Sequence, residues 1–177
     1  INNDNIEFFR SFWDFYRNVK GFPQEFTVGE TGAWNRVSSG ADASQTLRTW
    51  MWEMIARGAD TILYFRWRQS VMGEENHPAI LPWSGVPGEI YSMIKSAREE
   101  YLSLNDELSN LPLPNAEAVI LHEPLSALFF KKTNDYNYFR TVVRCNSALC
   151  TFGLLADIAP VNPSLDLKKY KLVILPL

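Results

Sequence analysis

The sequence predicts an α/β protein built from two units, each with a parallel sheet. Two observations carry this prediction. Helical and strand patterns alternate over the first hundred residues and again near the C-terminal end, and such alternation is typical of parallel strands with helices packed outside them. Between the two runs stand Pro112 and Pro114, which disfavour both a helix and a central strand. The sequence therefore predicts a boundary between two units at this point.

The first elements follow from apolar spacing and from helix-breaking residues. Apolar residues recur every three or four positions over residues 5–20, which predicts an amphipathic helix that ends at Gly21 and Pro23. Residues 26–28 then form a short apolar strand that ends at Gly29–Glu30.

A long loop and a helix are expected next. Residues 31–44 are rich in Gly, Ser, Ala and Asn, which is typical of a loop. Ser44 is a suitable N-cap for a helix that runs to about Met54 and stops at Gly58. Residues 61–67 are rich in β-branched and aromatic side chains, which predicts a second strand.

The rest of the chain repeats the alternation. A loop of about twenty residues with several Gly and Pro separates the second strand from a helix over residues 89–108. Beyond the boundary we expect strands at 118–121, 156–161 and 172–175 and a helix at 135–152. This is the opening of a doubly wound α/β domain, and its first strand is not followed by a dinucleotide-binding Gly-x-Gly-x-x-Gly.

Composition excludes some classes of partner and leaves others open. The formal net charge is −3 and Lys and Arg do not cluster, which argues against a nucleic-acid partner. Aromatic residues make up 14% of the chain, with six Trp, which fits a sugar-binding cleft or equally a large core. Cys145 and Cys150 suggest neither a metal site nor a disulfide framework. We expect no metal and no cofactor. We also expect a cytoplasmic location, because neither a membrane span nor a signal peptide is visible.

Three groups of residues could carry chemistry. Glu30 stands where a strand ends, a position at which α/β barrel enzymes place catalytic groups, although a surface loop carboxylate is the alternative. Arg66 and Arg68 share one face of the second strand and need carboxylate or ligand oxygens, so either ion pairs or substrate contacts are expected. Glu74 and His77 could bind sugar hydroxyls, and a metal site is the weaker interpretation because other ligands are missing.

Together these residues resemble glycoside hydrolase family 42, the β-galactosidases. The resemblance covers nearly the whole chain. The matching segments are Phe9–Arg17, Lys20–Pro23, Phe26–Glu30, Gly58–Asp60, Tyr64–Gln69, and Glu74 with His77.

The resemblance implies a fold, an activity and partners. It implies that residues 1–110 are the C-terminal part of a (β/α)8 TIM barrel and that 115–177 begin a flavodoxin-like trimerisation domain. It also implies a retaining β-galactosidase that acts on β-galactosides, as oligosaccharides or simple glycosides, and forms a homotrimer. Glu30 is then the nucleophile, and Trp34, Glu74 and His77 bind substrate.

This sequence departs from the family pattern in three places. Thr31 follows the nucleophile where a Gln is usual, and Trp34 precedes Asn35 instead of following an Asn. The family's acid/base is the Glu of an Asn-Glu pair, and no such pair occurs upstream of Glu30. We therefore expect this chain to be a fragment that does not hydrolyse β-galactosides by itself. Two alternatives remain open, a related glycosidase acting on another sugar such as an arabinoside, and a non-catalytic oligomerisation or interaction module.

Overall fold

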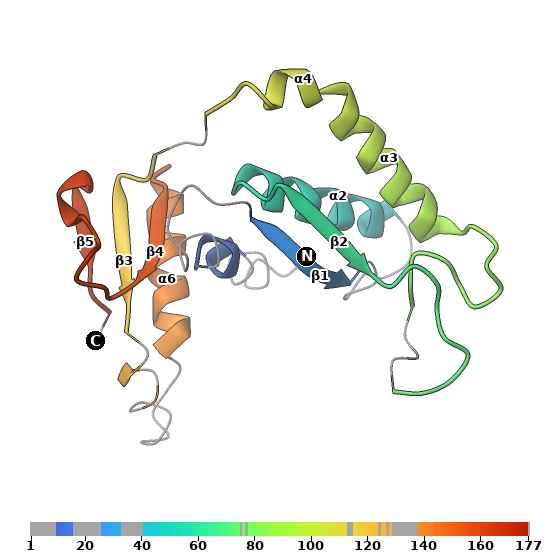
Figure 1. Cartoon of the computed structure of the whole chain (residues 1–177), viewed down its shortest axis with the longest axis horizontal. Helices are drawn as coiled ribbons and strands as arrows, with labels where there is room; N and C mark the ends of the chain where they lie inside the picture. The colour runs from blue at the N-terminus through green and yellow to red at the C-terminus, as the bar shows by residue number, and fades with distance from the viewer. Residues whose placement is uncertain are drawn as a thin grey trace. The chain divides into compact units, whose positions relative to one another are not determined.

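The computed structural model describes residues 10–15, 26–32, 41–74, 76, 78–112, 115–123, 125–126, 128 and 138–176. The chain folds into two compact units (Figure 1). The first unit holds the described residues from 26 to 112. The second unit holds residues 10–15 and the described residues from 115 onward. The predicted α/β class is confirmed, since each unit contains a parallel sheet. No helix among the described residues is long and apolar enough to cross a membrane.

The first unit alternates strands and helices as predicted, with two corrections. Its elements are β1 (Thr27–Gly32), α2 (Ala41–Ala56), β2 (Thr61–Phe65), α3 (Glu89–Ser103) and α4 (Asn105–Leu108). The cap predicted at Ser44 is wrong, because α2 already begins at Ala41, and alanines at positions 41 and 43 favour a helix there. The single helix predicted over 89–108 is interrupted at Leu104, which separates α3 from α4.

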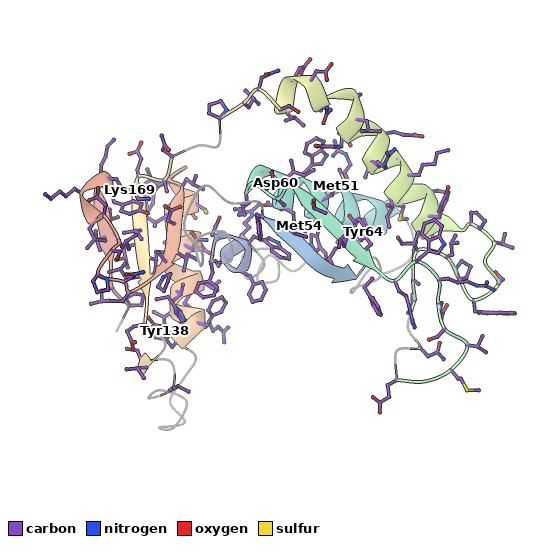
Figure 2. All side chains as sticks on the ribbon, in the orientation of Figure 1. Met51, Met54, Asp60, Tyr64, Tyr138 and Lys169 are labelled. Carbon is purple, nitrogen blue, oxygen red and sulfur yellow. The ribbon has the colours of Figure 1, made fainter. Side chains whose placement is uncertain are left out.

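Strands β1 and β2 are parallel neighbours in a sheet of two strands (Figure 1). Their common start is fixed by Asp60, labelled in Figure 2. The Phe26 N–H donates to Asp60 Oδ2 at 2.8 Å, and the Asp60 N–H donates to the Phe26 carbonyl at 2.9 Å. Just before it, Gly58 has φ of 86°, a left-handed conformation that ends helix α2 at the predicted position.

This sheet has one covered face and one open face. Val28 is 3% exposed and its partner Ile62 is half-buried, whereas Thr27 and Thr61 are exposed. Leu63, which points to the same side as Thr61, is 51% exposed. Helix α2 buries a row of apolar residues spaced four and three apart, as in an amphipathic helix. The row consists of Leu47, Met51 and Met54, two of them labelled in Figure 2.

The second unit contains a sheet of three parallel strands. Its elements are β3 (Ala118–His122), α6 (Tyr138–Thr151), β4 (Ala156–Pro160), the 3-10 helix η1 (Leu167–Lys169) and β5 (Leu172–Ile174). The strand order is β4-β3-β5, so β3 is central (Figure 1). All three predicted strands are confirmed: each starts at the predicted residue and ends one residue away from the predicted end. The predicted helix is confirmed from Tyr138 to Thr151, and residues 135–137 lie outside the described residues.

Both faces of β3 are buried. On one face Ile120 packs with Ile158 and with residues of α6, including Val142. On the other face Val119 packs with Ala159 and Tyr170. The residues Ala118, Val119 and Ile120 are at most 1% exposed, as expected for a central strand of a parallel sheet.

Residues 10–15 are helical and pack on α6 within the second unit. The Asn146 side-chain amide donates to Ser11 Oγ at 3.1 Å and to Asp14 Oδ2 at 3.0 Å, and all three side chains are buried. The prediction placed residues 1–110 in one unit and 115–177 in the other. Residues 10–15 therefore belong to a different unit from the one expected, while the assignment of the units to named domains stays a prediction.

Candidate active site

Glu30 lies within β1, at an irregular point of the sheet. The prediction ended the strand at Gly29–Glu30, whereas β1 continues to Gly32. Val28 pairs with Ile62, but the next paired residue of β1 is Thr31, opposite Tyr64. Three steps along β1 thus match two along β2, which is the signature of a β-bulge. Bulges are frequent next to active sites, where they redirect a side chain.

The carboxyl ends of the two strands lie at one edge of the sheet, because β1 and β2 are parallel. Glu30 stands near this edge on β1. Glu74 belongs to the segment that leaves the same edge after Phe65, the last residue of β2. The structure thus places the backbone of Glu30 and the segment bearing Glu74 at the end of the sheet where α/β enzymes hold their catalytic groups.

The segment after β2, residues 66–88, contains a short backbone ladder. The Leu81 N–H donates to the Trp67 carbonyl at 2.8 Å, and the Gln69 N–H donates to the Leu81 carbonyl at 2.9 Å. Ala79 and Ile80, which precede Leu81, are buried. Arg68 and Leu81 form an isolated parallel bridge, so the two paired stretches run in the same direction. We call the described residues of 66–88 the tongue, and its two paired stretches, residues 66–69 and 80–83, its arms.

Arg68 bonds to backbone rather than to a carboxylate. Its Nε and Nη2 donate to the Trp83 carbonyl at 2.9 and 2.6 Å, which joins the two arms of the tongue. Arg66 donates to Ser70 Oγ at 3.0 Å and stacks over the Phe65 ring, 5.1 Å from its centroid. The sequence analysis did not foresee this backbone partner of Arg68, and contact of Arg68 with a ligand stays a prediction.

Glu74 is exposed at the tip of the tongue. Gly73, with φ of 102°, begins the turn, and the Asn76 N–H donates to the Gly73 carbonyl at 3.1 Å. Asn76 also bonds back to the tongue, because its Oδ1 accepts from Gln69 Nε2 at 3.3 Å. Glu74 thus has access to a ligand. The predicted site residues Trp34 and His77, and the side chain of Glu30, lie outside the described part of the structure.

Tyr64 adds a neutral polar group to the first unit. Burial raises the pKa of its phenol, so Tyr64 keeps its proton at neutral pH and can act as a hydrogen-bond donor. Among the described residues, no group of three or more His, Cys, Asp or Glu side chains could hold a metal ion.

Two features of this region escaped the sequence analysis. The bulge in β1 has only one sequence signal, Gly29, a residue that often marks a bulge inside a strand. The Arg68–Trp83 bond joins residues fifteen apart, and its only signal is Gly85. A Cβ on Gly85 would lie 3.4 Å from the Arg68 guanidinium carbon, and the φ of 77° itself favours glycine.

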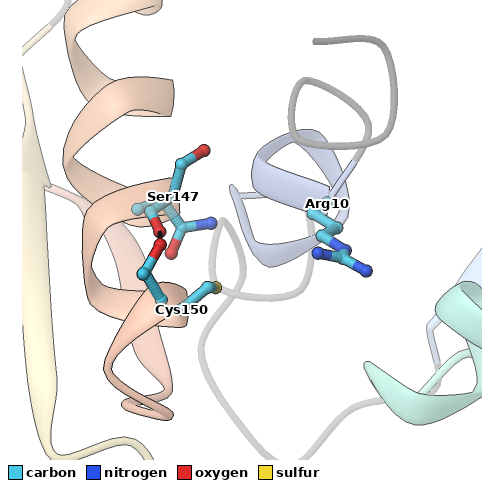
Figure 3. Close-up of a pocket in the computed structure, with 5 residues that line it drawn as sticks. Arg10, Ser147 and Cys150 are labelled. Atoms are coloured by element: carbon cyan, nitrogen blue, oxygen red, sulfur yellow. Dashed lines mark hydrogen bonds between the residues drawn. The ribbon is translucent and has the colours of Figure 1, made fainter. Parts of the chain in front are cut away.

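The second unit holds a separate small pocket, which includes none of the predicted site residues. It is lined by Arg10, Asn146, Ser147, Cys150 and Thr151 (Figure 3). In Figure 3 the Arg10 side chain points away from α6, on which Ser147 and Cys150 lie. Nothing in this arrangement makes the pocket a candidate for glycoside chemistry.

Comparison with known proteins identifies the family of this chain. The model of glycoside hydrolase family 42, described as beta-galactosidase, matches residues 2–104. A beta-galactosidase of Halorubrum lacusprofundi is 32% identical over 132 residues, which cover 73% of this chain and 18% of that protein. One from Haloferax lucentense is 28% identical over 169 residues, which cover 92% of this chain and 24% of that protein.

A solved structure shows the same fold. The crystal structure of beta-galactosidase from Bacillus circulans sp. alkalophilus matches with a TM-score of 0.80 and 22% identity, over 96% of this chain and 26% of that one. This chain spans about a fifth to a quarter of the length of the curated relatives it matches. Because the family model matches more than half of the chain, the protein belongs to glycoside hydrolase family 42.

Proposed function

We propose that the protein of which this chain forms part is a retaining β-galactosidase that hydrolyses terminal β-galactosides. The observation that carries the proposal is the family match over residues 2–104, which spans β1 with Glu30 and the tongue with Glu74. Both lie on elements that meet at the carboxyl edge of a parallel sheet. That edge is where barrel enzymes carry out their chemistry.

The open sheet supports a barrel for the first unit. The side of β1 and β2 that exposes Thr61 and Leu63 corresponds in a barrel to the interior, which further strands would enclose. A complete barrel of this type needs about 250 residues. We infer that the first unit is the C-terminal part of a (β/α)8 barrel.

The strand order supports a flavodoxin-like second unit. Numbered along the chain, its strands lie in the order second, first, third. That order begins the flavodoxin-like topology, whereas in the Rossmann order the third strand does not neighbour the first. By the family resemblance we assign this unit to trimer formation, and the whole protein to the cytoplasm. Light scattering of the full-length protein tests the trimer, and a monomer or dimer would contradict it.

In the proposed mechanism Glu30 acts as the nucleophile. Its carboxylate attacks the anomeric carbon of the galactosyl group while the bond to the leaving oxygen breaks. A second carboxyl group, about 5 Å away in retaining enzymes, protonates that oxygen. Water activated by the second group then cleaves the glycosyl–enzyme ester and releases Glu30. The register shift between Val28 and Thr31, the stretch that contains Glu30, supports this role, since a bulge can redirect a side chain.

Substrate binding falls to the loops at the same edge. We assign Glu74 and His77 to galactose hydroxyls and Trp34 to stacking on an apolar sugar face. The exposure of Glu74 supports this role, because an accessible carboxylate can accept hydrogen bonds from a ligand. Bonds that shorten toward the transition state contribute to the rate.

The test replaces Glu30 in the full-length protein. Glu30→Ala should lower the turnover of a nitrophenyl β-galactoside by about four orders of magnitude or more. Azide should then restore turnover and yield the α-galactosyl azide, because it attacks from the side that the carboxylate has left. Glu99→Gln, an exposed carboxylate on α3, is the matched control and should retain full activity.

Two outcomes would overturn the proposal. Undiminished turnover by Glu30→Ala would remove Glu30 from the mechanism. A nitrophenyl arabinoside hydrolysed faster than the galactoside would replace the substrate. The 177-residue chain should show no galactosidase activity in the same assay, and clear turnover by it would refute the expectation that the acid/base lies elsewhere.

A further inference from the structure

The tongue exposes two tryptophans. Trp67 is 61% exposed and Trp83 is 62% exposed, one on each arm. Apolar residues on the same segment, Ala79, Ile80 and Leu81, are at most 9% exposed, so the tongue buries one apolar set and presents another. An indole is a large apolar surface with a single donor, and it suits a ligand that has an apolar face and polar edges.

Backbone hydrogen bonds hold both tryptophans in place, and a ring contact also holds Trp67. The Trp67 carbonyl accepts from the Leu81 N–H, and its ring meets the Tyr91 ring edge-on at 6.3 Å between centroids. The Trp83 carbonyl accepts two hydrogen bonds from Arg68, and the Gly85 N–H donates to the Pro82 carbonyl at 2.9 Å. These contacts fix the backbone under each ring. A fixed aromatic surface loses little conformational freedom when a ligand binds.

Trp67 precedes Glu74 by seven residues and Trp83 follows it by nine, so all three belong to the tongue. In the proposed function Glu74 contacts the galactose hydroxyls. No residue has yet been assigned to bind the ring on the other side of the scissile bond, which is the leaving group. The exposed aromatic surface of Trp67 and Trp83 lies on the same segment as Glu74. Sugar rings present C–H faces on which such surfaces stack.

We propose that Trp67 and Trp83 bind the leaving group of the substrate, the sugar or aryl ring released when the galactosyl bond breaks. Arg68 is a positioning residue that holds Trp83 through its backbone carbonyl. This inference rests on the proposed function, and it assigns leaving-group selectivity to the tongue.

The experiment compares two substrates of the full-length protein that differ only in the leaving group. Lactose releases a sugar ring, whereas β-galactosyl fluoride releases fluoride and has no ring to stack. Trp67→Ala and Trp83→Ala should each lower kcat/KM for lactose roughly fivefold to tenfold, in keeping with the usual strength of aromatic contacts, and leave the value for the fluoride unchanged. Phe152→Ala removes an aromatic ring that is 79% exposed in the second unit and should change neither value.

Arg68 is tested by the same pair of substrates. Arg68→Ala removes both bonds to Trp83 and should reproduce the selective loss on lactose seen for Trp83→Ala. Arg68→Lys keeps the charge and one donor but not the two-donor geometry, so it should recover part of that loss. A change confined to KM for lactose, with the fluoride kinetics intact, distinguishes positioning of Trp83 from a general loss of folded protein.

The outcomes separate this inference from the proposed function. If the wild-type protein hydrolyses neither substrate, the proposed function fails and this inference fails with it. If the wild type is active but both tryptophan variants lose lactose and fluoride turnover equally, or lose neither, the assignment of the tongue to the leaving group is overturned while the proposed function stands.

Discussion

The two sheets differ in how completely the chain encloses them. Strand β3 of the second unit has neighbours on both sides and covered faces above and below, and its residues Val119 and Ile120 are fully buried. Strands β1 and β2 of the first unit have only each other among the described residues, and Leu63 of β2 remains 51% exposed. Yet Glu30, the candidate catalytic residue, lies on β1 of this two-stranded sheet.

This difference indicates which sheet mainly stabilises the fold and which sheet can hold catalytic groups. A parallel strand that is covered on both faces is a core element whose residues are chosen for packing. A sheet that presents one face and its carboxyl edge can hold polar groups such as Glu30 within reach of a ligand. The comparison predicts where substitutions reduce the free energy of unfolding and where they do not.

The largest expected effect is in β3, the central strand of the three-stranded sheet in the second unit. Ile120→Ala removes a fully buried side chain from the core formed with Ile158 and Val142. The cavity and the lost burial should lower the free energy of unfolding of the second unit by about 2–5 kcal/mol. Hydrogen exchange of peptides from the second unit measures it. An effect below about 0.5 kcal/mol, within the range of ordinary surface substitutions, would show that β3 is not a core strand.

A smaller loss is expected where residues 10–15 meet α6. Asn146→Ala removes the amide that donates to Ser11 and Asp14 and leaves a buried carboxylate with fewer donors. We expect a cost of about 1–3 kcal/mol, with faster hydrogen exchange in residues 10–15 than in β3. Asn105→Ala, on exposed α4, is the matched control. Unchanged exchange in residues 10–15 would mean that they are held by other contacts.

The second unit should also weaken in mild acid. Burial lowers the pKa of His122, which lies between the rings of Phe15 and Tyr138, while the Glu123 carboxylate acts in the opposite direction. A lowered folded pKa means that the unfolded chain binds the proton more tightly. The contribution of His122 to the free energy of unfolding is therefore fully present above the ordinary histidine pKa of 6.5. It declines as the pH falls toward the lower pKa of His122 in the folded protein.

The slope of this decline should not exceed about 1.4 kcal/mol per pH unit, since one proton is involved. Denaturant unfolding of the chain and of His122→Phe at several pH values between about 5 and 7 measures it. This window lies above the carboxylate range, where Glu123, whose pKa is lowered by backbone donors, begins to contribute. An identical pH dependence in the variant would remove His122 as the cause.

The smallest effect is expected in the two-stranded sheet of the first unit. Leu63→Ala should change the stability of the 177-residue chain by less than about 0.5 kcal/mol, because the side chain is already half exposed. In the full-length protein, where we propose that Leu63 faces the interior of a barrel, the same substitution should cost about 2–5 kcal/mol. Equal effects in both proteins would contradict the barrel assignment.

Local patterns predicted most elements but not their pairings. The β-branched run at residues 61–65 and the apolar run at 118–121 carry their own strand signal, and Gly58 marks a helix end by its need for a left-handed φ. The start of α2 was missed because Ser44 looked like a cap, although a serine also fits inside a helix. The role of Arg68 was missed because its partner, the Trp83 carbonyl, is fifteen residues away and belongs to the backbone.

The sequence by itself determined the α/β class and the order of the elements, because these depend on residue type and spacing along the chain. Its resemblance to the family indicated Glu30 as the candidate nucleophile. Only the tertiary structure decided which strands pair and in what order, that the register of β1 shifts between Val28 and Thr31, that Arg68 bonds to the Trp83 carbonyl, and that residues 10–15 pack on α6. These features depend on contacts between residues far apart in sequence. Many registers of two strands satisfy the same alternation, and packing selects one of them.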